Sequence, residues 1–102
     1  MKVKNKVLVK VIVPEIDSSY DIFIPVNEII WKVKRLILKS IKDLTGGFID
    51  DNVEFMLVNK ETGQVYLNNI TILNSDIRNA TELILITSYE SKFNFTGVNP
   101  NL

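Results

Sequence analysis

Cysteine and histidine, which carry much of enzyme chemistry near neutral pH, are both absent from this chain of 102 residues. Their absence excludes thiol catalysis, disulfides and Cys/His zinc sites, and it removes the usual general base. Asp17, Ser18 and Ser19 stand together, but a hydrolase triad built on them would need a histidine. The segment Asn59 to Gly63, NKETG, is predicted to be a turn and not a phosphate-binding loop. We therefore predict no catalytic residues.

Three carboxylates, Asp50, Asp51 and Glu54, are the remaining candidates for a chemical site. Carboxylate oxygens are the ligands that calcium and magnesium prefer, but these three lack the spacing of any calcium loop. A solvated acidic turn is the favoured interpretation. We predict neither a metal site nor a cofactor.

The overall composition indicates one folded domain without strong electrostatic partners. Hydrophobic residues make up 46% of the chain, and 12 basic residues balance 12 acidic ones. A net charge of zero argues against a nucleic-acid binder and against attraction to anionic membranes, although it leaves room for a local basic patch. No signal peptide is visible, and no apolar run approaches the ~20 residues that would insert into a bilayer. We expect a cytoplasmic protein.

One amphipathic helix is predicted from Asn27 to about Leu44, with Asn27 as its N-cap and Gly46 and Gly47 at its end. A lone helix of this length must bury its apolar stripe against something, and the flanking strands are the only partner the chain offers. At helical spacing Ile29 and Leu36 widen that stripe on one side. The inward stripe consists of Ile30, Val33, Ile37, Ile41 and Leu44.

All other segments have the alternation or the turn residues of a β-sheet. One domain is expected over residues 1–88, followed by a tail over 89–102 that is partly disordered or adds an edge strand. The fold class is therefore α+β, with a mixed sheet packed on one long helix. The predicted strands are Lys2–Val13, Tyr20–Val26, Val53–Val58, a short Val65–Leu67 and Thr81–Ser88.

This order of elements is that of the β-grasp fold, and individual residues resemble ubiquitin. In the helix, an apolar residue at Ile30 is followed three later by the pair Val33–Lys34 and then by Ile37, as in ubiquitin. The segments around Thr71–Ile72 and Leu83–Leu85 also keep ubiquitin's apolar spacing. The resemblance implies a ubiquitin-like β-grasp domain with a mixed four- to five-stranded sheet.

Where ubiquitin carries its conjugation chemistry, this sequence differs. A modifier's last strand leads to a terminal Gly-Gly, whereas the pair here, Gly46–Gly47, follows the helix. Among non-conjugating relatives, the chain most resembles the YukD/EsaB family of type VII (WXG100) secretion accessory proteins. That resemblance implies a non-catalytic adaptor whose partners are components of the secretion apparatus. The alternatives are a carrier or conjugation-like β-grasp protein of another pathway, or the N-terminal domain of a larger membrane subunit.

The predicted interaction surface is the outer face of the sheet, away from the helix. In a β-grasp sheet the first, third and last strands are neighbours, so their outward residues form one apolar patch, as ubiquitin's recognition surface does. Such a patch usually indicates a protein partner or a homodimer. Alternatively, the tail around Phe93 to Phe95 covers it, or it is ordinary surface. The patch consists of Leu8, Ile12, Met56, Val58, Ile84 and Ile86.

Two helix positions are secondary candidates. Trp31, with Leu38 seven residues on, is either a binding hot spot or, in the favoured interpretation, part of a wider buried footprint under Tyr20 or the loop after Gly47. Lys34 lies near the inward stripe, and we expect its stem to be buried and its charge to reach the sheet edge.

Overall fold

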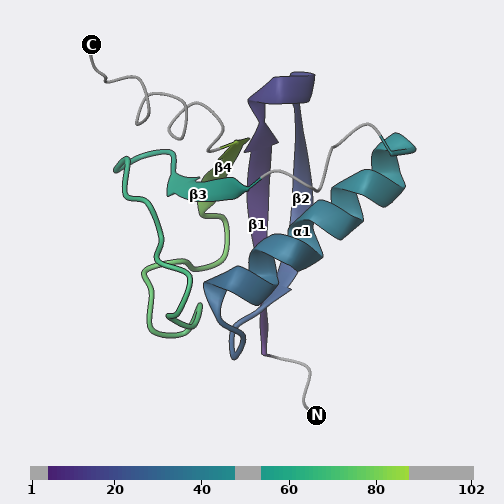
Figure 1. Cartoon of the computed structure of the whole chain (residues 1–102). Helices are drawn as coiled ribbons and strands as arrows, with labels where there is room; N and C mark the ends of the chain where they lie inside the picture. Colours follow the sequence, from purple (N-terminus) through teal and green to yellow (C-terminus); the bar gives the residue numbers. More distant parts are fainter. Residues whose placement is uncertain (1–4, 48–53, 88–102) are drawn as a thin grey trace.

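The computed structural model describes residues 5–47 and 54–87. Four strands form one sheet in the order β2-β1-β4-β3, and a single long helix lies against it (Figure 1). The elements are β1 (Lys6–Val13), the short 3-10 helix η1 (Pro14–Ile16), β2 (Ser18–Pro25), α1 (Ile30–Thr45), β3 (Phe55–Asn59) and β4 (Glu82–Thr87).

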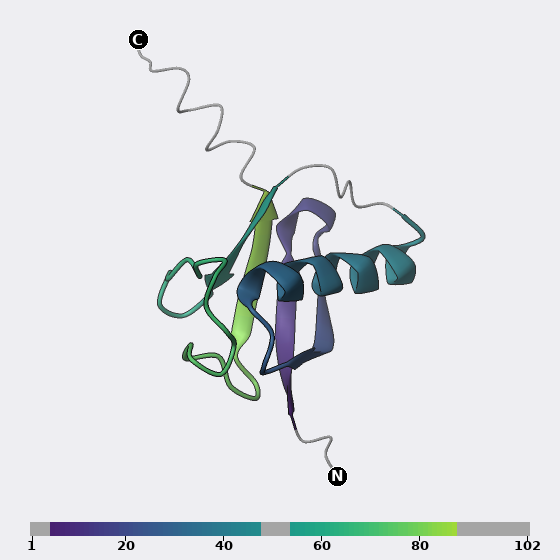
Figure 2. The same ribbon diagram turned by 60° about the horizontal axis from the view of Figure 1, so that its bottom comes forward.

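The sheet is mixed, as the β-grasp prediction requires. Strand β1 pairs antiparallel with β2 and parallel with β4, and β4 pairs antiparallel with β3. Helix α1 crosses one face of this sheet, and the other face carries no helix within the described residues (Figure 2). The predicted short strand Val65–Leu67 is reduced to an isolated bridge between Val65 and Val58. The sheet therefore has four strands, the lower of the two predicted numbers.

The core lies between α1 and the sheet, and it follows the predicted alternation. The inward residues of each strand are buried, because successive side chains of a strand point to opposite faces. Full burial of an aliphatic side chain contributes roughly 1.5–3 kcal/mol, so this layer supplies most of the stability. The side chains that are 0% or 1% exposed are Val9, Val11, Val13, Ile24, Ile30, Val33, Ile37, Ile41, Leu57, Ile72, Ile77, Leu83 and Leu85.

Helix α1 begins three residues later than predicted, and Asn27 does not cap it. The N-cap is Ile29, which makes no side-chain capping bond. Instead, the backbone N–H of Ile30 donates to the carbonyl of Ile70 at 2.8 Å, and that of Trp31 donates to the carbonyl of Asn68 at 3.1 Å. Free N–H groups at a helix start need acceptors, and here a distant segment of the chain provides them.

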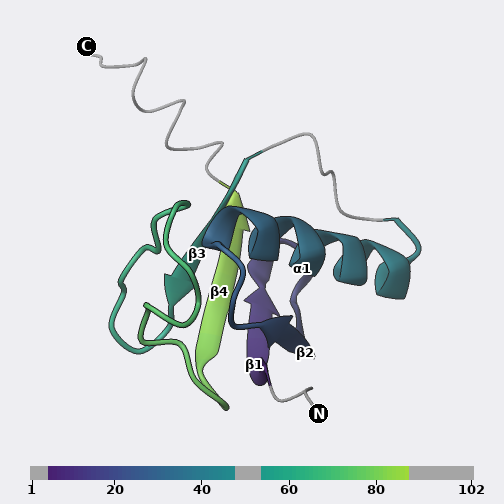
Figure 3. The same ribbon diagram turned by 90° about the horizontal axis from the view of Figure 1, so that it is seen from below.

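The end of α1 agrees with the prediction in its cap but not in its packing. Gly46 adopts the left-handed conformation, with φ of 75°, and closes the helix through a bond to the Lys42 carbonyl. Leu44, predicted to face inward, is 66% exposed. The last turns of α1, to which Leu44 belongs, project beyond β2 (Figure 3). The width of the sheet, rather than the period of the helix, limits the buried stripe.

The segment between β3 and β4 is held by side-chain hydrogen bonds rather than by regular structure. The Tyr66 hydroxyl donates to Asp76 Oδ1 at 2.5 Å and accepts from Asn59 Nδ2 at 3.0 Å. Asn59 Oδ1 accepts the backbone N–H groups of Glu61 and Thr62, which shapes the predicted turn. Asn59 is buried and Tyr66 is 3% exposed. This network fixes the end of β3 to the segment that also caps α1.

Candidate functional site

Five outward side chains form a continuous apolar surface across β1, β4 and β3, which we call the outer apolar patch. Cross-strand partners share a face, so their register shows which side chains adjoin. Ile84 is the partner of Ile12 on one side and of Val58 on the other, and Met56 is the partner of Ile86 on the next row. All five are partly exposed, whereas the residues alternating with them in these strands are buried or point to α1. Cross-strand contact thus joins the residues predicted for this patch, except Leu8.

Leu8 lies outside the patch, because a row of charged residues crosses the sheet between them. In this row Lys10 is the cross-strand partner of both Asp21 and Glu82. Lys60 Nζ lies 3.2 Å from Glu82 Oε1 in an exposed ion pair. The charges in the row balance, so the row limits the patch without giving it a net charge.

Beyond the charged row, Leu8 belongs to a second apolar spot that includes a residue missing from the predicted surface. Phe23 is the cross-strand partner of Leu8, and the two are 60% and 37% exposed. The signal was present in the sequence, since Phe23 alternates with the inward residues Ile22 and Ile24.

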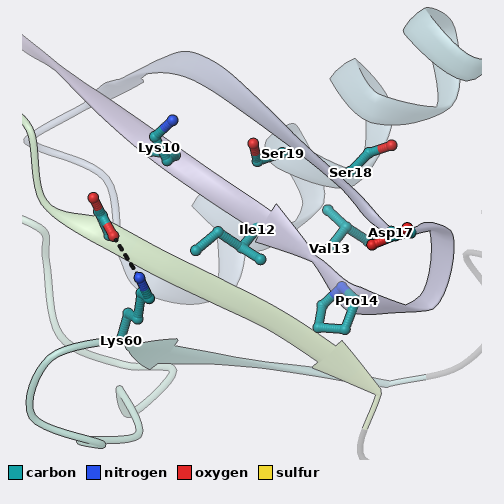
Figure 4. Close-up of a pocket in the computed structure, with 9 residues that line it drawn as sticks. Lys10, Ile12, Val13, Pro14, Asp17, Ser18, Ser19 and Lys60 are labelled. Atoms are coloured by element: carbon teal, nitrogen blue, oxygen red, sulfur yellow. Dashed lines mark hydrogen bonds and ion pairs between the residues drawn. The ribbon is translucent and has the colours of Figure 1, made fainter.

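A shallow hollow of about 430 Å³ adjoins the patch, between the β1–β2 turn and the charged row (Figure 4). Lys10 and Ile12 line it from β1, Ser18 and Ser19 line it from β2, and the Lys60–Glu82 ion pair forms its far side. Its walls carry both apolar and charged groups, as the edge of a protein contact surface does.

The candidate residues on the helix separate in the structure. Leu38 packs against the core and is partly buried, as the favoured interpretation proposed. Trp31 is 46% exposed, so neither Tyr20 nor another described segment covers it. The guanidinium of Arg35 lies 5.3 Å from the centre of the Trp31 ring, in cation–π geometry.

Lys34 behaves as predicted, with a partly buried stem and its charge at the sheet edge. Its ammonium donates to the carbonyl of Phe55 at 2.7 Å. Burial lowers the pKa of Lys34 below 10.5, and the negative charge of Glu54 partly offsets this effect. The bond ties α1 to the first residue of β3, which is a structural role.

Other candidate sites from the sequence form no chemical constellation in the described part of the chain. Asp17 adopts φ of 52° and closes η1, and Ser18 Oγ donates to the carbonyl of Ile16. Asp50 and Asp51 lie outside the described residues, whereas Glu54 is exposed. Residues 5–47 and 54–87 contain no group of three potential metal ligands. In the same two ranges, no helix is long and apolar enough to cross a membrane.

Comparison with known proteins gives structural but not sequence relatives. No protein-family model and no curated protein matches the chain. The C-terminal ubiquitin-like domain of the human 2'-5'-oligoadenylate synthetase-like protein superposes with a TM-score of 0.59 at 23% identity, covering 85% of this chain and 88% of that one. A ubiquitin-like domain from Arabidopsis thaliana gives 0.61 at 15% identity, covering 85% and 82%.

A third structure is a chain of the ESX-5 inner membrane complex. It superposes with a TM-score of 0.64 at 12% identity and covers 96% of this chain. The matched region makes up only 28% of the length of the ESX-5 chain. At these identities the superpositions establish architecture and not activity. With the sheet order and the helix placement, they show that the chain has the ubiquitin-like β-grasp fold.

Proposed function

We propose that this protein is a non-catalytic ubiquitin-like adaptor that binds protein partners through the outer apolar patch. The observation that carries the proposal is the register of Ile12, Ile84 and Val58, which brings three aliphatic side chains into one row on the face of the sheet away from α1. Met56 and Ile86 extend this row. Contiguous exposed apolar surface on a small domain is typical of a protein-binding site.

The residues around the patch favour a specific protein contact over nonspecific hydrophobic association. The charged row of Lys10, Glu82 and Lys60 borders it and offers polar groups at the rim, the arrangement seen in protein interfaces. Met56 has a flexible, polarisable side chain that suits an adaptable contact. We infer that the partner's contact surface lies across β4, with the outer apolar patch at the centre of the interface.

We further propose that the partners are components of a type VII secretion apparatus and that the protein acts in the cytoplasm. The sequence resemblance to the YukD/EsaB family and the structural likeness to a chain of the ESX-5 inner membrane complex support this assignment. Neighbouring genes for WXG100 proteins or a secretion ATPase would agree with it. If such genes are absent from its surroundings, the proposed role in type VII secretion is contradicted, whereas the proposed binding of a protein partner is not.

Two other roles have their own tests. Because the domain matches only part of the ESX-5 chain, a domain of a larger membrane subunit is the second candidate, and the same gene context would reveal it. A carrier or conjugation-like role would give a covalent thioester adduct when the protein is incubated with an activating enzyme. Such an adduct would contradict the adaptor proposal.

The adaptor proposal is tested by introducing charge into the patch. Ile84→Asp should abolish binding to the cytosolic domains of the secretion apparatus in calorimetry, or abolish self-association in light scattering, while circular dichroism stays native. Leu44→Asp introduces the same charge at an exposed position on α1 and should bind normally. If Ile84→Asp fails to fold, Met56→Lys on β3 gives the same test. Binding unchanged in a folded patch variant would refute the proposal.

A further inference from the structure

The solvent face of α1 carries a concentration of positive charge that the neutral net charge of the chain conceals. Four basic residues, Lys32, Arg35, Lys39 and Lys42, are exposed on it, and Asp43 is the one acidic residue within the helix. The chain as a whole has 12 basic and 12 acidic residues. The charge is therefore segregated, and this side of the molecule is distinct from the balanced outer face of the sheet.

These four residues form a single stripe. Their spacings of three, four and three residues place them within about 80° of one another around the helix axis. The stripe is ~15 Å long, because a helix rises 1.5 Å per residue. It lies opposite the buried residues Ile37 and Ile41, so it is directed away from the sheet.

The charges of Lys32, Arg35 and Lys39 are little neutralised within the described ranges. Lys32 Nζ lies 3.9 Å from Glu28 Oε1, but both side chains are about half exposed, which makes this a weak pair. Arg35 contacts the face of Trp31, which leaves its positive charge in place. In residues 5–47 and 54–87, neither Arg35 nor Lys39 forms an ion pair.

A leucine flanks the stripe on each side, and these leucines distinguish between classes of ligand. Leu36 and Leu38 are two positions apart, so they lie on opposite sides of the stripe, about 160° from each other around the helix axis. Leu36 is 38% exposed. On a flat anionic membrane Asp43, which is one turn from Lys39, would face the anionic headgroups. A nucleic acid would offer no aliphatic group to the leucines.

We propose that this face of α1 is a second docking surface, which binds an acidic segment of another protein that also carries apolar anchor residues. Carboxylates of the segment pair with Arg35 and Lys39, and an apolar side chain of the segment packs against the exposed Leu36. An amphipathic helix with leucines at helical spacing fits this arrangement. Because the surface lies on the opposite layer from the outer apolar patch, the two can be occupied together.

The test uses a fluorescein-labelled acidic amphipathic peptide with leucines at helical spacing, titrated with the full chain and followed by anisotropy. Lys39→Glu should weaken binding roughly tenfold, since it replaces an attraction with a repulsion. Lys6→Glu makes the same change in net charge at an exposed position on β1 and should bind like the wild type. Ile84→Asp should also bind normally, which separates this surface from the adaptor site.

Two further probes identify the ligand class. A peptide with the same leucines, but with amides in place of its carboxylates, should bind at least fivefold more weakly. Vesicles containing phosphatidylserine and a single-stranded RNA should not bind in a manner sensitive to Lys39→Glu. The proposal is overturned if Lys39→Glu and Lys6→Glu weaken binding equally, if the peptide does not bind, or if vesicles or RNA bind and lose affinity with Lys39→Glu.

Discussion

Replacing Tyr66 with phenylalanine should destabilise the fold by about 2 kcal/mol, although the ring itself is kept. The hydroxyl donates to Asp76 Oδ1 at 2.5 Å and accepts from Asn59 Nδ2 at 3.0 Å. Losing the bond to a carboxylate costs roughly 1.5–3 kcal/mol, and a buried donor left without an acceptor costs about 1–3 kcal/mol. Asn59 is buried, but Asp76 is exposed and regains water, so the sum lies near the lower end.

The same substitution should remove an alkaline transition. Burial raises the pKa of Tyr66 to about 12 from its ordinary value of 10.0, and the bond to Asp76 adds to this effect, while the bond from Asn59 opposes it. A raised pKa means that the folded state holds the proton more tightly than the unfolded state. The stabilisation is present below about pH 10 and is lost as pH rises toward 12. Two pKa units correspond to at most about 2.7 kcal/mol, a value that solvent around Asp76 reduces.

Urea unfolding of wild type and Tyr66→Phe, followed by circular dichroism, measures both effects. At neutral pH the variant should unfold at roughly 1–2 M less urea and at a melting temperature roughly 8–16 °C lower. The difference should shrink as pH rises from about 10 to 12, because only the wild type loses the protonated hydroxyl. A neutral-pH difference below about 0.5 kcal/mol, or one that is constant with pH, would refute this account of the network.

Three further outcomes follow from the packing of α1. Ile37→Ala should cost about 3–4 kcal/mol because Ile37 is fully buried, whereas Leu44→Ala should cost under about 1 kcal/mol in the same urea assay; similar values would contradict the exposure of Leu44. Gly46→Ala should cost about 1 kcal/mol through its positive φ alone, since no described residue other than its chain neighbours lies within 4 Å of the added methyl, and a stabilised variant would contradict this conformation. Burial lowers the pKa of Lys34, so the free energy of unfolding should rise as pH increases through the range just below 10.5; Lys34→Met should remove that rise, and a slope unchanged by the substitution would argue against burial of the Lys34 ammonium.

The outer apolar patch shows how far the periodicity of a strand can be interpreted. Alternation correctly predicted which face Ile12, Val58 and Ile84 occupy, because side-chain direction in a strand is a local property. It did not separate Leu8 from them. That separation depends on the pairing of Lys10 with Glu82, residues that meet only when β1 and β4 align.

The helix shows the corresponding limit for a 3.6-residue period. The period correctly predicted that Ile30, Ile37 and Ile41 are buried, and the glycines after Leu44 correctly predicted the C-terminal cap at Gly46. It failed at Leu44, which belongs to the turns of α1 that project beyond β2, and at Asn27, because carbonyls of the segment at 68–70 accept the first N–H groups of the helix. The residues of the helix and its near neighbours in the sequence determine neither the width of the sheet nor the path of the segment at 68–70.

The sequence by itself determined the fold class, the orientation of strand residues and the absence of thiol and imidazole chemistry, because each depends on residue type or on neighbours within a few positions. Only the tertiary structure decided which outward residues adjoin, and it left the basic stripe of α1 facing solvent. Strand register and charge pairing join residues that are far apart in the chain, such as Ile12 and Ile84, and no local pattern specifies such contacts.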